Sequence, residues 1–120
     1  MKSKKPSFQE TQRLILSEIQ GVLESVEKEE IEALVDAIIE ARRVFVIGVG
    51  RVLLSLQMMA KRLFHLGISI HVVGDVTEPA AGSSDLIIVG SGSGESIVPV
   101  AVAKRAKELG AKVFTYRSEP

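Results

Sequence analysis

The sequence predicts an α/β domain built around a parallel sheet, and two observations lead to this prediction. Short apolar runs with strand character alternate along the chain with longer segments of helical periodicity, and such alternation is typical of parallel sheets with right-handed crossovers. Three of these runs are followed directly by glycine-bearing turns: Gly48-Val49-Gly50, Gly74-Asp75 and Ser91-Gly92-Ser93-Gly94. Because ligands in parallel sheets bind beyond the carboxyl ends of the strands, we expect all three turns to share one ligand-binding edge.

Two helices are expected ahead of the first strand. Between Phe8 and Val26 the apolar residues take helical spacing from Ile15 onward, and a second apolar stripe covers 31–39. Residues 1–7 form a short basic tail that we expect to be disordered.

The first half of the sheet follows from local composition. The β-branched and aromatic run Val44–Ile47 predicts a buried strand. A helix is expected over Arg51–Leu66, closed by Gly67. A second strand is expected over Ile68–Val73, and residues 75–84 are expected to form a loop.

The second half repeats the pattern. A third strand over Leu86–Val89 leads into a helix over Ile97–Leu109, whose first turn tolerates Pro99. A fourth strand is expected over Lys112–Tyr116, and nothing in the sequence covers its outer edge. We therefore expect a fragment, a truncated gene product, or a subunit completed by association.

Composition excludes several classes of protein. Lys plus Arg and Asp plus Glu both number 15, so a net charge of zero argues against nucleic acid as a partner. The chain has no cysteine, which excludes disulfides and thiolate metal sites. No signal peptide is recognisable, and no apolar run approaches the roughly 20 residues that span a membrane. We expect a cytoplasmic protein without a membrane partner.

The segment Ser91–Ser96 predicts a phosphate site. It joins a buried strand to a helix start, where free backbone N–H groups and the helix dipole favour an anion. The hydroxyls of Ser91, Ser93 and Ser96 add donors, although serines are also ordinary turn and N-cap residues. Glu95 is not assigned to the phosphate because its charge would repel the anion.

Further candidates lie in the turn after the first strand and on the helix that follows it. Gly48 and Gly50 suggest a dinucleotide-binding turn, but Leu53 stands where that motif needs a small residue. Arg51 is a cation at a helix start, where the dipole disfavours it, so it either binds an anion or is simply solvated. His65 lies in the last turn, where a histidine also interacts favourably with free carbonyls.

Four stretches of the chain resemble one known family. They are Val46-Ile47-Gly48-Val49-Gly50-Arg51, Lys61-Arg62-Leu63-Phe64-His65-Leu66-Gly67, Val72-Val73-Gly74-Asp75-Val76-Thr77-Glu78-Pro79 and Ser91-Gly92-Ser93-Gly94-Glu95-Ser96. With these stretches and their spacing, the chain resembles the sugar isomerase (SIS) domain family, and within it the 6-phospho-3-hexuloisomerases. The last stretch is the family's most characteristic loop.

The resemblance implies a flavodoxin-like three-layer α/β/α sandwich over residues 8–120 that binds a phosphorylated sugar. It implies that the serine loop holds the phosphate and that Gly48, Gly50 and Arg51 lie in the substrate site, with His65 at a catalytic position. Hexuloisomerase members convert 3-hexulose 6-phosphate to fructose 6-phosphate without metal or cofactor, and they are oligomeric. The resemblance therefore implies a dimer or tetramer that needs neither.

Two departures from the family keep alternatives open. Val52-Leu53 stand where the family usually has Ser-Gly, and the family's proposed catalytic glutamate lies beyond the fourth strand. The candidates left for a catalytic base are His65, Glu95, Asp75 and Glu78. The chain is then either a phosphosugar isomerase or a non-catalytic phosphosugar-binding module of the kind found in sensors and regulators; a ligand-free scaffold is the third reading.

Helix geometry adds one constraint on catalysis. Arg51 and His65 are 14 positions apart on one expected helix, so about 21 Å separates their backbones. We therefore expect His65 to act in the site of a neighbouring subunit.

Overall fold

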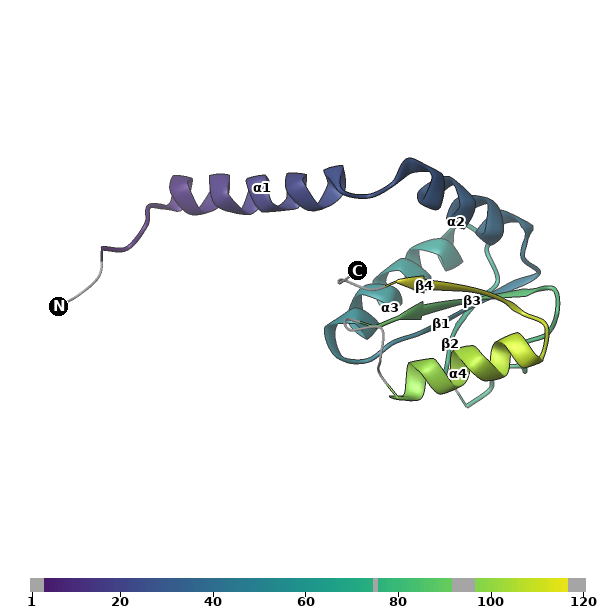
Figure 1. The fold of residues 1–120 in the computed structure, drawn as a ribbon. Coiled ribbons are helices and arrows are strands. Elements are labelled where there is room, and N and C mark those ends of the chain that lie inside the picture. The colour runs from purple at the N-terminus through teal and green to yellow at the C-terminus, as the bar shows by residue number, and fades with distance from the viewer. Residues whose placement is uncertain (1–3, 75, 92–96, 117–120) are drawn as a thin grey trace. The chain divides into compact units, whose positions relative to one another are not determined.

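The computed structural model describes residues 4–74, 76–91 and 97–116 and divides the chain into two compact units, Met1–Val35 and Asp36–Pro120 (Figure 1). Along the chain the elements are α1 (Phe8–Glu24), α2 (Lys28–Glu40), β1 (Arg43–Ile47), α3 (Gly50–His65), β2 (Ile70–Val72), β3 (Asp85–Gly90), α4 (Ile97–Glu108) and β4 (Lys112–Tyr116). The predicted order of helices and strands is confirmed.

The first unit contains α1, whose start is set by local hydrogen bonds. The Ser7 hydroxyl accepts from the backbone N–H of Glu10, and the Glu10 carboxylate accepts from the N–H of Ser7. This capping box satisfies two N–H groups that a helix start leaves unpaired. The large apolar side chains of α1, from Phe8 to Leu23, are not buried within this unit.

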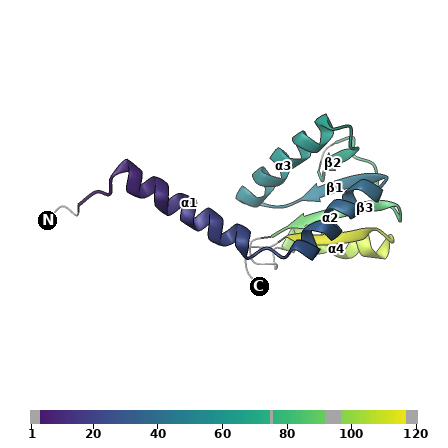
Figure 2. The same ribbon diagram turned by 90° about the horizontal axis from the view of Figure 1, so that it is seen from above.

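The second unit is built on one parallel sheet of four strands in the order β2-β1-β3-β4. Helix α3 connects β1 to β2 and lies on one face, and α4 connects β3 to β4 and lies on the other (Figure 2). Opposite faces follow from right-handed crossovers, because the two connections leave β1 and β3 in opposite directions. The expected α/β/α sandwich with a parallel sheet is confirmed.

The two central strands supply the core. Every residue from Val44 to Ile47 and from Asp85 to Gly90 is buried. Side chains alternate between the faces, so Phe45, Ile47, Ile87 and Val89 pack on the α4 side against Val102, Ala103 and Ala106. Strands buried on both faces have continuous apolar sequences, which is why β1 and β3 could be predicted from the sequence.

Strand β2 is shorter than expected, since it begins at Ile70 rather than Ile68. The reason is the end of α3. Gly67 adopts a φ of +89°, and the N–H groups of Gly67 and Ile68 donate to the carbonyls of Phe64 and Leu63. These bonds complete the helix end and remove residues 67–68 from the ladder.

None of the helices within the described residues has the length and apolar character needed to cross a membrane.

Candidate functional site

The sheet has one point at which its strand order reverses. From β1 the chain crosses to β2 on one side, and it then crosses back to place β3 on the other side of β1. Ligands in open α/β sheets bind at such a switch point, beyond the carboxyl ends of the two strands that flank it. Here those ends carry Gly48–Arg51 after β1, and Gly90 as the last residue of β3 with Ser91 directly after it; Ile47 pairs with Val89. The structure therefore brings these two predicted site segments together.

Two glycines allow α3 to pack directly on the strand ends. A Cβ atom added at Gly90 would lie 2.4 Å from Val52 Cγ1 and 2.8 Å from Leu56 Cδ1. One added at Gly48 would lie 3.1 Å from Leu56 Cδ1 and 3.3 Å from the Gly90 carbonyl oxygen. Val52, which departs from the resembled family, is thus half-buried against Gly90 at the switch point.

The start of α3 favours a negative charge. Gly50 has a φ of +58°, which turns the chain sharply from β1 into the helix. The N-cap is Val49, which makes no side-chain capping bond, and the first turn contains no acidic residue. No capping bond from the Val49 side chain and no acidic side chain of the first turn therefore offsets the free N–H groups and the positive end of the α3 dipole. Arg51 lies exposed in this same turn, which fits both an anion-binding and a simply solvated arginine.

Ser91 is buried at the end of β3, with only 1% of its surface exposed. It lines an open cavity of about 180 Å³ between α4 and the strands β3 and β4. The other lining residues are Val89, Val100, Ala103, Lys104, Lys107, Val113 and Thr115. Lys104 and Lys107 line the same cavity as Ser91, which the sequence reasoning missed because an exposed lysine on a helix has no distinguishing signal. Ser93, Ser96 and Glu95 lie outside the described residues.

The turn after β2 is organised by a carboxylate. Gly74 adopts a φ of +107°, and its N–H donates to Glu78 Oε1 over 2.9 Å. Because β2 is parallel to β1 and adjacent to it, this contact lies at the same edge of the sheet as Gly48–Arg51. We call the Gly74–Glu78 hydrogen bond the rim contact. Asp75, the other acidic candidate here, lies outside the described residues.

His65 lies at the opposite end of α3 from Arg51. It is the last residue of the helix, it is exposed, and its ring lies 6.3 Å from that of Phe64. The helix spacing places the two candidates about 21 Å apart. One chain therefore does not bring His65 and Arg51 to the same site. His71 is half-buried in β2 and stacks on Phe45 with ring centroids 5.4 Å apart.

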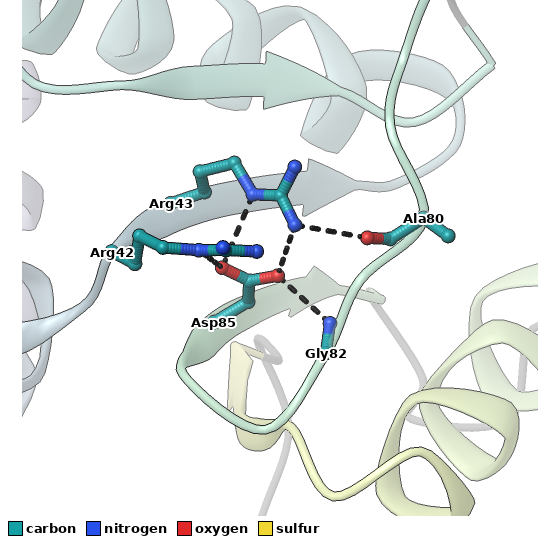
Figure 3. Close-up of polar contacts among 5 residues, drawn as sticks. All are labelled: Arg42, Arg43, Ala80, Gly82 and Asp85. Atoms are coloured by element: carbon teal, nitrogen blue, oxygen red, sulfur yellow. Dashed lines mark hydrogen bonds and ion pairs between the residues drawn. The ribbon is translucent and has the colours of Figure 1, made fainter.

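A buried ion pair at the other edge of the sheet escaped the sequence reasoning. The Asp85 side chain is fully buried at the first position of β3, and Arg43 Nη2 lies 2.9 Å from its Oδ2 (Figure 3). Burial raises the pKa of the Asp85 carboxyl, but hydrogen bonds from Arg43 and Gly82 and the charges of Arg43 and Arg42 outweigh it and hold the pKa below its usual range. Asp85 is thus ionised at neutral pH. A single aspartate before an apolar run gives no sequence signal for this role.

No protein-family model matches the chain. A 3-hexulose-6-phosphate isomerase from Mycobacterium gastri is 39% identical over 107 residues, which are 89% of this chain and 54% of that protein. A crystal structure of a hypothetical protein from Methanococcus jannaschii, from which a 3-hexulose-6-phosphate isomerase function was inferred, superposes with a TM-score of 0.74 at 37% identity. That match covers 77% of this chain and 52% of the other.

The sugar isomerase domain of an RpiR transcription factor from Sphaerobacter thermophilus superposes with a TM-score of 0.73 at 26% identity, over 87% of this chain and 62% of the other. Sheet order and these likenesses together show that the chain has an α/β fold similar to that of the sugar isomerase (SIS) domain. More particularly, it is a homologue of the 3-hexulose-6-phosphate isomerases. It spans about half the length of the curated relatives it matches.

Proposed function

We propose that the chain binds a phosphorylated sugar at the switch point between β1 and β3, as part of an isomerase that interconverts 3-hexulose 6-phosphate and fructose 6-phosphate. The observation that carries the proposal is the meeting of Gly48–Arg51 with Ser91 at this switch point, in a chain 39% identical to a 3-hexulose-6-phosphate isomerase. The phosphate is bound by Ser91, Ser93, Ser96 and the backbone at the start of α4, while Arg51 binds substrate oxygens. No metal or cofactor is part of the proposal.

The reaction moves a proton between neighbouring carbons through an enediol, so it needs an acid–base group at the carbon. Among the acidic candidates, Glu78 already uses one oxygen on the Gly74 N–H. We assign the acid–base role to His65, because it matches the position of an active-site histidine in the resembled hexuloisomerases and histidine is the most common general acid–base residue. Its distance from Arg51 requires that it act across an interface in a homo-oligomer, a dimer or tetramer. The proposal places this enzyme in the cytoplasm.

The direct test is calorimetric titration with fructose 6-phosphate, followed by an assay of 3-hexulose 6-phosphate isomerisation. We expect a dissociation constant in the micromolar to millimolar range that is typical of metabolic substrates. Fructose without the phosphate is the matched control, and it should bind at least 100-fold more weakly. Equal affinity for the two sugars would overturn the phosphate site.

A second candidate function is phosphosugar sensing without catalysis. The likeness to the RpiR sugar isomerase domain favours it, as does Val52, whose apolar side chain packs against Gly90 at the switch point. The two candidates differ in one result. A sensor binds fructose 6-phosphate and leaves 3-hexulose 6-phosphate unchanged, whereas an isomerase does both.

Subunit mixing tests the role of His65. Arg51→Ala and His65→Ala should each inactivate the isomerase, but co-refolded mixtures should recover part of the activity, because some shared sites then contain one intact copy of each residue. Native mass spectrometry verifies that hetero-oligomers form. If verified hetero-oligomers stay inactive, His65 does not act across the interface.

A further inference from the structure

The connection from β2 to β3 covers a sheet face without a helix. None of its described residues, 73–74 and 76–84, is helical, yet Val73 and Ala81 pack on the core cluster that contains Phe45 and Ile87. A helix would pair its own backbone groups, whereas an irregular segment needs other partners. The segment also runs from the candidate site at one edge of the sheet to the start of β3 at the other.

An ion pair supplies those partners at the far end. Arg43 Nε donates to Asp85 Oδ1 over 3.3 Å, and Arg43 Nη2 donates to Asp85 Oδ2 over 2.9 Å. The same Nη2 donates to the carbonyl of Ala80 over 3.1 Å, and Asp85 Oδ2 accepts from the N–H of Gly82 over 2.8 Å. Figure 3 shows Ala80 and Gly82 on the segment that passes the two side chains. Two backbone groups of the segment are therefore held by one pair, which we call the clamp.

The guanidinium of Arg43 is itself held in place. Its Cζ lies 5.7 Å from the centroid of the buried Phe45 ring, and the side chain is only 21% exposed. A planar guanidinium with two parallel bonds to a carboxylate has a fixed orientation. The carbonyl of Ala80 is thus bound by a rigid donor.

The clamp is close in sequence to the rim contact. Glu78 accepts from the Gly74 N–H, Arg43 binds the Ala80 carbonyl, and between them lies only Pro79. Proline has a fixed φ and restricts the residue before it, so Pro79 leaves fewer rotations that could absorb a displacement between Ala80 and Glu78. A displacement of Ala80 therefore displaces Glu78, whose carboxylate retains acceptor capacity for a sugar hydroxyl beyond its bond to Gly74.

We propose that Arg43 and Asp85 are positioning residues for the candidate phosphosugar site: by holding Ala80 and Gly82 they fix Glu78 at the rim, where it accepts a hydrogen bond from a sugar hydroxyl. The proposal rests on the proposed function for its ligand. The clamp lies at the amino-terminal ends of β1 and β3, so it acts on the ligand only through the segment.

The experiment compares two neighbouring arginines. Arg43→Lys keeps the charge but loses the fork that binds Asp85 and Ala80 together. Arg42→Lys is the matched control, because Arg42 Nε lies 3.7 Å from Asp85 Oδ1 and its side chain is 63% exposed. Amide hydrogen exchange over 76–84 and the affinity for fructose 6-phosphate are measured for both, with thermal unfolding to verify the fold.

We expect exchange in this segment to rise at least tenfold in Arg43→Lys and the affinity to fall about tenfold, with neither changing in Arg42→Lys. Loss of affinity should be non-additive with Glu78→Ala, because Arg43 acts through Glu78. A merely structural contribution of Arg43 would add to that of Glu78 instead.

The outcomes separate the two proposals. Exchange needs no ligand, so unchanged exchange in Arg43→Lys overturns the clamp whatever the chain binds. Faster exchange with unchanged affinity, or additive effects of Arg43→Lys and Glu78→Ala, overturns the positioning role. If the wild-type chain binds no phosphosugar, the proposed function is wrong, and so is the proposed ligand role of Glu78. The exchange result still decides whether the clamp holds the segment.

Discussion

Replacing Ser91 and Ser93 together with alanine should abolish binding of fructose 6-phosphate. Ser91 directly follows β3 at the switch point and is buried, and Ser93 comes two positions later in the sequence. A hydrogen bond to a charged group contributes about 1.5–3 kcal/mol, so loss of two should weaken binding by about 3–6 kcal/mol. This corresponds to a fall in affinity of at least about 100-fold, measured by calorimetry.

The matched control for this variant is Ser83→Ala with Ser84→Ala. These two serines are also adjacent to β3, but they precede it, at the edge of the sheet away from the switch point, and both are exposed. The control pair should bind the sugar like the wild type. Because Ser91 is buried, thermal unfolding is recorded for each variant. An affinity within threefold of wild type in a folded Ser91/Ser93 variant would contradict the proposal that these serines bind the phosphate.

Gly90→Ala should destabilise the second unit by about 3 kcal/mol, since overpacking a core costs this much when neighbours cannot move. The new Cβ atom would lie 2.4 Å from Val52 Cγ1 and 2.8 Å from Leu56 Cδ1. Val52 is β-branched and restricted at χ1 within a helix, so it cannot simply rotate away. The start of α3, with Arg51, must shift instead, and phosphosugar affinity should fall together with stability.

Two further variants make the Gly90 prediction specific. Gly90→Ala combined with Val52→Ala should recover part of the lost stability, because it removes Val52 Cγ1, the closer of the two methyl groups in conflict. Gly82→Ala should be nearly neutral, because its Cβ would meet only Asp85 Oδ2 at 3.9 Å. Urea unfolding gives the three free energies. If Gly90→Ala and Gly82→Ala prove equally stable, the close packing of α3 on β3 is not what requires a glycine at position 90.

Local pattern was enough to predict most of the second unit. The β-branched runs of β1 and β3 and the helical stripe of α3 each carry a periodicity that depends only on their own residues. The glycines that close α3 and α4 act within one turn, through backbone bonds such as Gly110 N–H to the Lys107 carbonyl. The predicted start of β2 was wrong by two residues, because Gly67 and Ile68 complete the end of α3.

The candidate site was predicted in part for the same reason. Gly48, Gly50, Arg51 and Ser91 stand next to strand ends in the sequence, and parallel strands necessarily bring such ends to one edge. His65 was singled out through the family resemblance, and helix geometry alone separates it from Arg51. Its role remains a proposal, as does that of the serine loop.

The sequence by itself determined the class of fold and which turns meet at one edge of the sheet, because each follows from short-range periodicity and the rules of parallel sheets. Only the tertiary structure decided which residues meet across long separations. The sequence shows Asp85 only as a residue beside an apolar strand. The sheet brings it next to Arg43, which stands 42 positions earlier in the chain. Gly90 reads as a turn residue until α3 packs against it. Both depend on contacts between elements, which burial and close packing create and which no local pattern records.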